Sequence, residues 1–395
     1  MGEYESRLAE IVANHSFRSL PRGSEILISS EYIAKPLYLA IQEALMAKGH
    51  HVTVDIICPE SDHLLLDKGS DEQIGHIPDH LEPKWKEIDA RIKIIGSEYP
   101  TILNDIPGSK HCIRGRAKSP INKIAGQKQH WIGVLYPTEA MAELEGMPFS
   151  ELRDFVHKAA IQDYGVLREC MLPIANAIQD GKELVVKKWY HKDERLLELK
   201  MDISLSLGET GDGRHNIPAG EVLTSPDARS VEGEIYSDIP IYYKGEKVCG
   251  VYLKFEKGKV VDYSAESGHK VLEGLLNTSE GAKMVGEIAV GMNLDVTRTF
   301  KSITLFTEKI GGTLHFALGN SFPVCYVPES ELYSEESQRV LKEYAEKGIM
   351  VERAGAHVDF PVDFRNCKHS DEGLYVDHKA FYVKNRLWLP DSSLL

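Results

Sequence analysis

The sequence predicts two domains of different class, an N-terminal α/β domain over residues 1–185 and a C-terminal mixed α and β domain over residues 186–395. The chain has 395 residues, more than a single hydrophobic core usually organises. Segments with strand-like and helix-like patterns alternate in the first half, as they do around a mostly parallel sheet. The second half holds closely spaced strand-like segments with turn residues between them, which is typical of antiparallel strands.

In the first half, the apolar pattern predicts the order helix, strand, helix, strand, strand, strand, at residues 3–15, 25–30, 33–48, 51–58, 91–96 and 131–136. Segments rich in Pro, Gly and His lie between the later strands, at 59–84 and 105–128. A strong helical pattern then runs from Pro148 to about Ala177. No glycine fingerprint of a dinucleotide fold follows the first strand, so no nucleotide is predicted there.

In the second half, residues 195–205 have the pattern of a long strand. Residues 235–264 predict two hairpins, with turns at Lys244-Gly245 and Lys257-Gly258. A short helix is expected from a cap at Ser279 to about Val285. This half is therefore predicted to be a mixed domain dominated by antiparallel strands.

Composition and charge exclude several classes of partner. Asp and Glu number 60 against 46 Lys and Arg, a net charge of −14 that disfavours a nucleic-acid partner. No apolar run approaches the roughly 18 to 20 residues that span a bilayer, so no membrane partner is expected. The first residues, M-G-E-Y-E-S-R-L, lack the pattern of a signal peptide, and we expect a cytoplasmic protein.

The cysteines and the N-terminal histidines do not form a recognisable site. The 6 cysteines include no C-x-x-C pair, and we interpret them as mostly buried thiols. Several histidines crowd the first half without the spacing of metal ligands, and we interpret them as solvated surface side chains: His50, His51, His63, His76 and His80.

Residues able to bind metal instead gather between Asn216 and Phe360, each within an apolar or Gly- and Pro-rich phrase. The phrases are N-I-P-A-G-E-V, G-E-I-A, T-L-H-F-A-L-G and H-V-D-F, and the residues are Glu221, Glu287, His315, His357 and Asp359. An unpaired charge is costly in such surroundings. Three carboxylates and two imidazoles would suit two divalent metals roughly 3.5–4 Å apart. The mixed C-terminal domain is therefore predicted to carry a dinuclear metal site.

Strand periodicity supports part of this set. On a strand, His357 and Asp359 point the same way while Val358 and Phe360 face a core. A buried His–Asp hydrogen bond is the structural alternative for this pair. His315 lies mid-strand among apolar and small residues, where a core histidine is the alternative to a ligand.

The two glutamates have different local settings. Glu287 lies where a helix is predicted to give way to an apolar strand, and a carboxylate there needs a cation or a donor. Pro218 and Gly220 predict a fixed turn that presents Glu221, and turns often carry site residues. An ordinary polar turn is the alternative.

In this order and spacing, the four phrases resemble those of the thermophilic metalloaminopeptidase family (aminopeptidase T and aminopeptidase S type), over about residues 216–360. The resemblance implies a cocatalytic site for two divalent metal ions, zinc or cobalt, at the five residues above. It also implies an α/β N-terminal domain, a homodimer, peptide substrates and an active site within a large cavity. One position departs from the pattern: the tyrosine seven residues after the histidine is Phe322 here, with Tyr326 four residues further on.

We therefore expect a metal-dependent aminopeptidase, a hydrolase that releases N-terminal amino acids from peptides by attack of an activated water. A carboxylate must accept the proton of that water. Glu287 could bridge the metals or act as this base. Glu308, in L-F-T-E-K-I, is the second candidate for the catalytic base, with a solvated strand end as its structural alternative.

Two other functions remain open from the sequence. His315, His357 and Asp359 alone could hold ferrous iron, and ring-cleaving dihydroxypyridine dioxygenases resemble the same fold family. Glu221 and Glu287 argue against a single iron, which would leave both acids without a purpose. A non-catalytic metal-binding protein is the third possibility, because Phe322 can neither bind metal nor donate a proton.

Overall fold

The structure is a computed structural model that describes residues 2–128, 130–243 and 245–391. The chain divides into two compact units. The first comprises residues 1–162 together with 213–218, and the second comprises residues 163–212 together with 219–395. The chain therefore returns briefly to the first unit before it enters the strands that carry all five predicted ligands.

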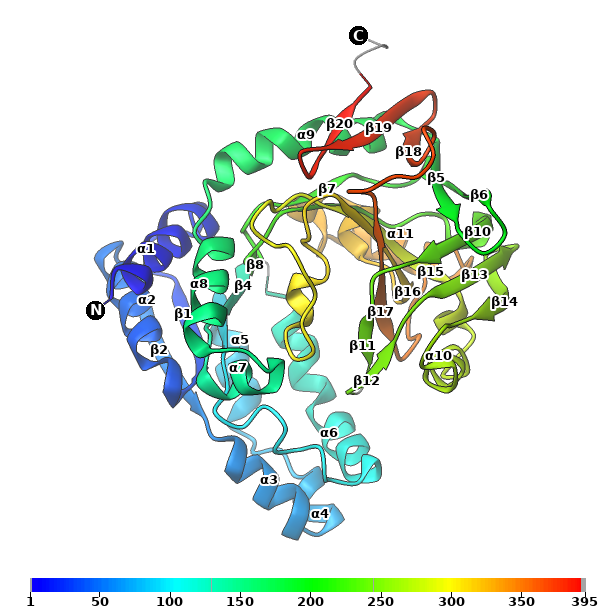
Figure 1. The fold of residues 1–395 in the computed structure, drawn as a ribbon. Helices are drawn as coiled ribbons and strands as arrows, with labels where there is room; N and C mark the ends of the chain where they lie inside the picture. Colours follow the sequence, from blue (N-terminus) through cyan, green and yellow to red (C-terminus); the bar gives the residue numbers. More distant parts are fainter. Residues whose placement is uncertain (1, 129, 244, 392–395) are drawn as a thin grey trace. The chain divides into compact units, whose positions relative to one another are not determined.

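A parallel sheet of 5 strands forms the centre of the first unit, in the order β2-β1-β3-β4-β8 (Figure 1). Its strands are β1 (Glu25–Glu31), β2 (His51–Ile57), β3 (Ala90–Ile95), β4 (His130–Leu135) and β8 (Asn216–Ile217). Ile26, Leu27 and Ile28 are consecutive and all buried, as expected for a strand that is covered on both faces. The predicted α/β class with a parallel sheet is confirmed.

The helices of this unit are α1 (Glu3–Ile11), α2 (Lys35–Ala47), α3 (Pro59–Lys68), α4 (Asp71–Gly75), α5 (Leu81–Glu87), α6 (Gly108–Gly126), α7 (Glu139–Glu145) and α8 (Phe149–Ala160). A π-helical turn over Val12–Ser16 extends α1. Helix α2 buries Leu37, Ile41 and Leu45, which lie one turn apart on a single apolar stripe.

The sequence left the structure of two segments of the first unit open, and one prediction for this unit needs correction. The Pro-, Gly- and His-rich segments 59–84 and 105–128 are largely helical, in α3 to α6. Their apolar pattern is weak, but contacts of α4 and α5 with α6 support these helices. His50, predicted to be a solvated side chain, is buried immediately before strand β2.

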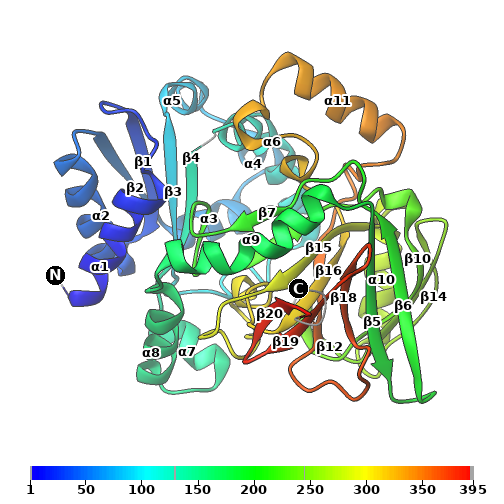
Figure 2. The same ribbon diagram turned by 90° about the horizontal axis from the view of Figure 1, so that it is seen from above.

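The second unit is built on antiparallel sheets (Figures 1 and 2). One sheet has the order β14-β13-β10-β6-β5-β18-β19-β20 and another has the order β17-β16-β15-β9-β7. The strands of the first are β5 (Glu183–Tyr190), β6 (Arg195–Asp202), β10 (Glu232–Ser237), β13 (Val251–Glu256), β14 (Lys259–Ser264), β18 (Gly373–Val376), β19 (Lys379–Lys384) and β20 (Leu387–Pro390). The strands of the second are β7 (Glu209–Gly211), β9 (Glu221–Thr224), β15 (Val285–Gly291), β16 (Thr313–Gly319) and β17 (His357–Asp363).

Further elements complete the second unit: helices α9 (Tyr164–Asp180), α10 (His269–Leu276) and α11 (Glu335–Glu346), and a two-stranded ribbon of β11 (Ile241–Tyr243) and β12 (Glu246–Val248). The predicted hairpin at Lys257-Gly258 joins β13 to β14. Lys244 of the other predicted turn lies outside the described residues. The helix expected after Ser279 is only a 3₁₀ turn at Gly281–Lys283.

The helical pattern predicted from Pro148 to Ala177 is two helices, and they belong to different units. Helix α8 ends at Ala160, and Asp163 begins α9 by accepting a hydrogen bond from the backbone N–H of Val166 at 3.0 Å. Helix α9 contacts strands β7, β9 and β20 of the second unit. The division at 162 therefore differs from the boundary predicted at residue 185.

Candidate metal centre

All five predicted ligands project from one face of the sheet formed by β9, β15, β16 and β17. Gly291 pairs with Glu221, Ala289 with His315, Ala317 with both Glu287 and Asp359, and Gly319 with His357. Directly paired residues of adjacent strands point to the same side of a sheet. The ligand positions therefore alternate with small side chains, which leave space between the acids and the imidazoles.

The opposite face of this sheet is core. Phe316 and Phe360 pair across β16 and β17, stack with ring centroids 5.4 Å apart, and are fully buried. Their burial fixes which face each strand presents, since a slip of one residue would exchange the faces. The apolar residues of the four phrases thus hold the ligands in register.

A β-bulge directs Glu287 toward the ligand face. Val285 pairs with Leu318 while Glu287 pairs with Ala317, so one extra residue, Gly286, lies in β15. A side chain at Gly286 has no room, because its Cβ would lie 2.2 Å from the carbonyl oxygen of Gly319. Glu287 lies within strand β15, where the sequence predicted a junction between helix and strand.

Glu221 is the first residue of strand β9, although the sequence predicted that it lies on a turn. Gly220 precedes it with φ +118°, a conformation that favours glycine. A Cβ at Gly220 would also come within 3.0 Å of Asn293. The conformation of Gly220 thus lets the chain enter strand β9 with Glu221 as its first residue.

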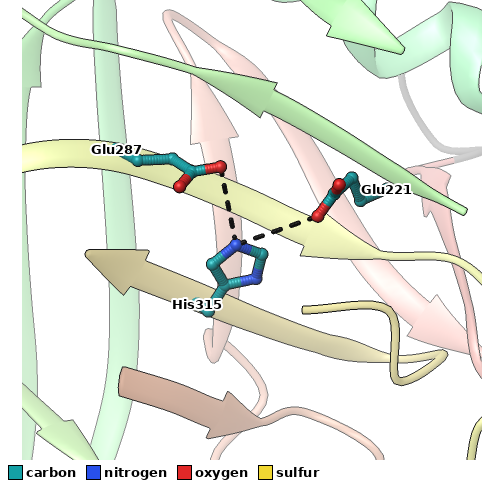
Figure 3. Close-up of side chains that lie close together, drawn as sticks. All are labelled: Glu221, Glu287 and His315. Atoms are coloured by element: carbon teal, nitrogen blue, oxygen red, sulfur yellow. Dashed lines mark ion pairs between the residues drawn. The ribbon is translucent and has the colours of Figure 1, made fainter. Parts of the chain in front are cut away.

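These side chains form two groups that share Glu287: Glu221, Glu287 and His315, and Glu287, His357 and Asp359. Figure 3 shows the first group, with both glutamates directed at the imidazole. His315 Nε2 lies 3.7 Å from Glu287 Oε1 and 4.0 Å from Glu221 Oε2. In the second group, His357 Nε2 lies 3.0 Å from Glu287 Oε2 and 3.5 Å from Asp359 Oδ1.

This arrangement fits metal ligands better than a set of hydrogen bonds. Both ring nitrogens of His315 and Oδ1 of Asp359 are buried without a hydrogen-bond partner in the described part of the chain. Ligands about 2.0–2.2 Å from one tetrahedral ion lie about 3.3–3.6 Å from each other. The separations around His315 and His357 are close to that range, and oxygen and imidazole donors suit zinc and related divalent ions.

Electrostatics couple the shared glutamate to both histidines. Burial alone would raise the pKa of Glu287, but the adjacent imidazole of His315 and the hydrogen bond with His357 outweigh burial and lower this pKa to about 2. Burial would lower the pKa of His315, yet Glu287 raises it to about 9. Asp359 and Glu287 likewise outweigh burial at His357 and raise its pKa to about 11. The acids thus stabilise positive charge at this site.

Glu308 and Lys309 form a second layer beside the ligands. The ammonium of Lys309 donates to Glu221 Oε1 at 2.9 Å and to Glu308. Burial raises the pKa of Glu308 to about 7, with Lys309 opposing this and the charges of Glu221 and Asp359 adding to it. Burial would lower the pKa of Lys309, but Glu221 and Glu308 outweigh burial and raise this pKa. Lys309 was not predicted as a site residue. Its signal in the sequence is its position between an acid, Glu308, and the apolar segment I-G-G-T-L.

The departure at Phe322 lies beside the second ligand group. The ring of Phe322 packs edge-on against His357 with centroids 5.0 Å apart and is 39% exposed. Tyr326 is buried elsewhere, and its hydroxyl donates to the carbonyl of Pro226 at 2.8 Å. That phenol is therefore committed to the backbone and does not replace a tyrosine at position 322.

The profile of the thermophilic metalloprotease (M29) family matches residues 3–362. The chain belongs to this family. The match includes all five predicted ligands and Glu308. It confirms the family resemblance drawn from the four phrases, extends it through the first unit, and identifies the family as one of hydrolases that require metal.

Two relatives match shorter parts of the chain than the family profile does. Aminopeptidase 2 of Geobacillus stearothermophilus is 36% identical over 127 residues, which cover 31% of this chain and 30% of that protein. Aminopeptidase T of Thermus thermophilus is 28% identical over 287 residues, which cover 66% of this chain and 69% of that protein. The matched regions thus span less than a third of the first relative and about two thirds of the second.

A solved structure shares the fold over almost its full length. Wild-type AmpT from Thermus thermophilus superimposes with a TM-score of 0.77 at 21% identity, over 98% of this chain and 99% of that one. The two-unit α/β and antiparallel architecture is therefore that of this structure. Within the part of the chain that is described, no helix has both the length and the apolar content needed to cross a membrane.

Proposed function

We propose that this protein is a two-metal aminopeptidase that removes N-terminal amino acids from peptides. The observation that carries the proposal is the position of Glu287, whose two carboxylate oxygens face different histidines. A carboxylate between two ligand groups is the bridge that a dinuclear site requires. Glu221 and His315 would complete one metal position, and His357 and Asp359 the other. Zinc and cobalt are the ions proposed.

When bound, such ions lower the pKa of a water molecule from about 15.7 toward 7 and polarise the scissile carbonyl. Glu287 is proposed as the bridging ligand, because both of its oxygens already face imidazoles. Glu308 is proposed as the base, because it contacts neither histidine and its pKa of about 7 suits proton transfer at neutral pH. It would accept a proton from the attacking water and return it to the leaving amine.

The architecture of the two ligand groups favours this hydrolase over the iron dioxygenase. His315 and His357 fall into different groups, whereas a single iron would need both with Asp359. Glu221 and Glu287 both lie in the candidate ligand groups, which supports a site for two metals. That the protein forms a homodimer stays a prediction, which sedimentation tests. A cytoplasmic location also stays a prediction, which cell fractionation tests.

Metal analysis combined with turnover of an aminoacyl-p-nitroanilide tests the proposal. Two divalent ions per chain and release of p-nitroaniline are expected. One iron per chain with oxygen uptake would establish the dioxygenase instead. Bound metal with neither activity would leave a binding protein, the possibility that Phe322 raised.

A further inference from the structure

Lys309 is a buried cation fixed at the edge of the first ligand group. Its side chain is 1% exposed. Its backbone N–H donates to Phe306 and its carbonyl accepts from the N–H of Asn293, both at 3.1 Å. The side chain of Asn293 in turn donates to the carbonyl of Ala219 at 2.8 Å. Lys309 and the segment that leads into Glu221 are thus tied to the same residue, which fixes the ammonium relative to the carboxylate.

The ammonium divides the two oxygens of Glu221. Oε1 accepts from Lys309 at 2.9 Å, while Oε2 is the oxygen that faces His315. Only one oxygen of Glu221 is therefore available to a metal in this group. The other oxygen is held in a charge-assisted hydrogen bond, which is stronger than a neutral one.

In the part of the chain that the structure describes, the second ligand group has no such cation. Among the described residues, the only ion pair of Asp359 is with His357. Glu287 serves both groups equally, one oxygen to each. The two groups have the same kinds of ligand, two carboxylates and one imidazole, but among the described residues only the first has a carboxylate already paired with an ammonium.

We propose that Lys309 makes the two metal positions unequal. It limits Glu221 to a single ligand oxygen and opposes a second cation nearby, because like charges repel across the short distances of a buried site. The position at Glu287, His357 and Asp359 therefore fills first and tightly. The position at Glu221, Glu287 and His315 fills second and exchanges readily. Lys309 is a positioning residue, and this inference rests on the two-metal site of the proposed function.

Calorimetric titration of chelator-stripped full-length protein with Co²⁺ at pH 7.5 tests this. The wild type should bind two ions per chain in two events whose Kd values differ at least tenfold. Lys309→Met keeps the length of the side chain without its charge, and it should tighten the weaker event at least tenfold. The visible spectrum of the second Co²⁺ should change as well, since Glu221 can then offer both oxygens.

Two control variants separate this role from loss of a buried ion pair. Lys309→Arg keeps the charge and should keep the two events apart. Lys188 is a matched buried lysine, 7% exposed, that pairs with Asp238 at 2.9 Å and Glu372 at 3.5 Å in the other large sheet. Lys188→Met should lower stability without altering either Co²⁺ event. An unchanged ratio of Kd values in Lys309→Met would overturn the proposal.

The order of filling can also be tested with Lys309 intact, in case Lys309→Met does not fold. Asp359→Asn should abolish the tight event, and Glu221→Gln should abolish only the weak one. The reverse assignment, or two equal events in the wild type, would overturn the inference while leaving the two-metal aminopeptidase in place. Binding of a single ion per chain would overturn both.

Discussion

Glu287 and His357 lie 3.0 Å apart, Oε2 to Nε2, although 70 residues separate them in the chain. Strands β15 and β17 do not pair with each other; β16 lies between them and supplies only Ala317 and Gly319 at this point. The contact thus crosses a strand that has no bulky side chain in the way. Small residues opposite the acids are therefore as necessary to the site as the acids themselves.

Glu287→Gln is expected to remove metal binding at both positions and to reduce peptide hydrolysis to the background rate. The amide keeps the shape of the side chain but loses the charge shared between the two histidines. Circular dichroism should show a folded chain, and mass spectrometry should show a loss of bound metal. Near-normal turnover in this variant would exclude Glu287 as ligand and as base.

Glu308→Gln is expected to behave differently. It should lower kcat by about 10²- to 10⁴-fold, the usual contribution of a general base, while both metals stay bound. In the wild type the rate should fall as the pH drops through about 7, because the carboxylate becomes protonated. That acidic limb should be absent from the residual activity of the variant. Loss of metal together with activity would instead make Glu308 a ligand.

Metal should stabilise the protein more at high pH than at low pH. The folded-state pKa values of His315 and His357, about 9 and 11, exceed the unfolded value of about 6.5. In the metal-free protein, their stabilising contribution is complete below pH 6.5 and declines as the pH rises through these values. Metal requires neutral imidazoles, so protons compete with it. The gain in Tm on adding Zn²⁺ should increase between pH 6 and 9, and a constant gain would contradict this.

Phe322→Tyr is expected to raise kcat by about tenfold without changing metal content. The ring already packs against His357, and a phenol there could donate a hydrogen bond to the oxyanion of the transition state. Tyr326→Phe is the matched control. It removes a hydroxyl that binds the backbone at Pro226, so it should cost about 1 kcal/mol of stability and leave kcat unchanged. If kcat does not increase in Phe322→Tyr, a phenol at this position is dispensable in this protein.

Gly286→Ala is expected to destabilise the protein by at least about 2 kcal/mol and to weaken metal binding, because the new Cβ meets backbone oxygens at 2.2 and 2.4 Å. Gly274→Ala in helix α10 is the control, since its Cβ meets nothing within 4 Å. That substitution should stabilise the helix by about 0.5–1 kcal/mol. Urea denaturation measures both, and equal effects would contradict the role of the bulge.

The grouping of the five candidate ligands was predictable because their surroundings were unsuitable for charge. Glu287, His315 and Asp359 each interrupt an apolar strand, and a soluble chain accepts that arrangement only where the charges meet a partner. The strand period also placed His357 and Asp359 on one face. The structure brings all five residues together on that face, while their roles as ligands await the experiments above.

Other features depend on contacts that local patterns do not encode. Lys309 follows a glutamate and resembles a surface residue in sequence; only the fold brings Glu221 to it. The bulge at Gly286 depends on the close approach of Gly319. Helices α3 to α6 have weak apolar stripes and depend on one another, and the break between α8 and α9 is three residues within one continuous helical pattern.

Strand β8 has a practical consequence for dissecting this protein. Residues 213–218 belong to the first unit, yet the chain on both sides of them belongs to the second. A fragment that stops at residue 162 would lack the fifth strand of its sheet and leave β4 as an open edge, prone to self-association. A fragment that begins at residue 186 would lose α9 and would carry strand β8 without its partner, β4. Neither unit can therefore be expressed as one continuous segment of the chain.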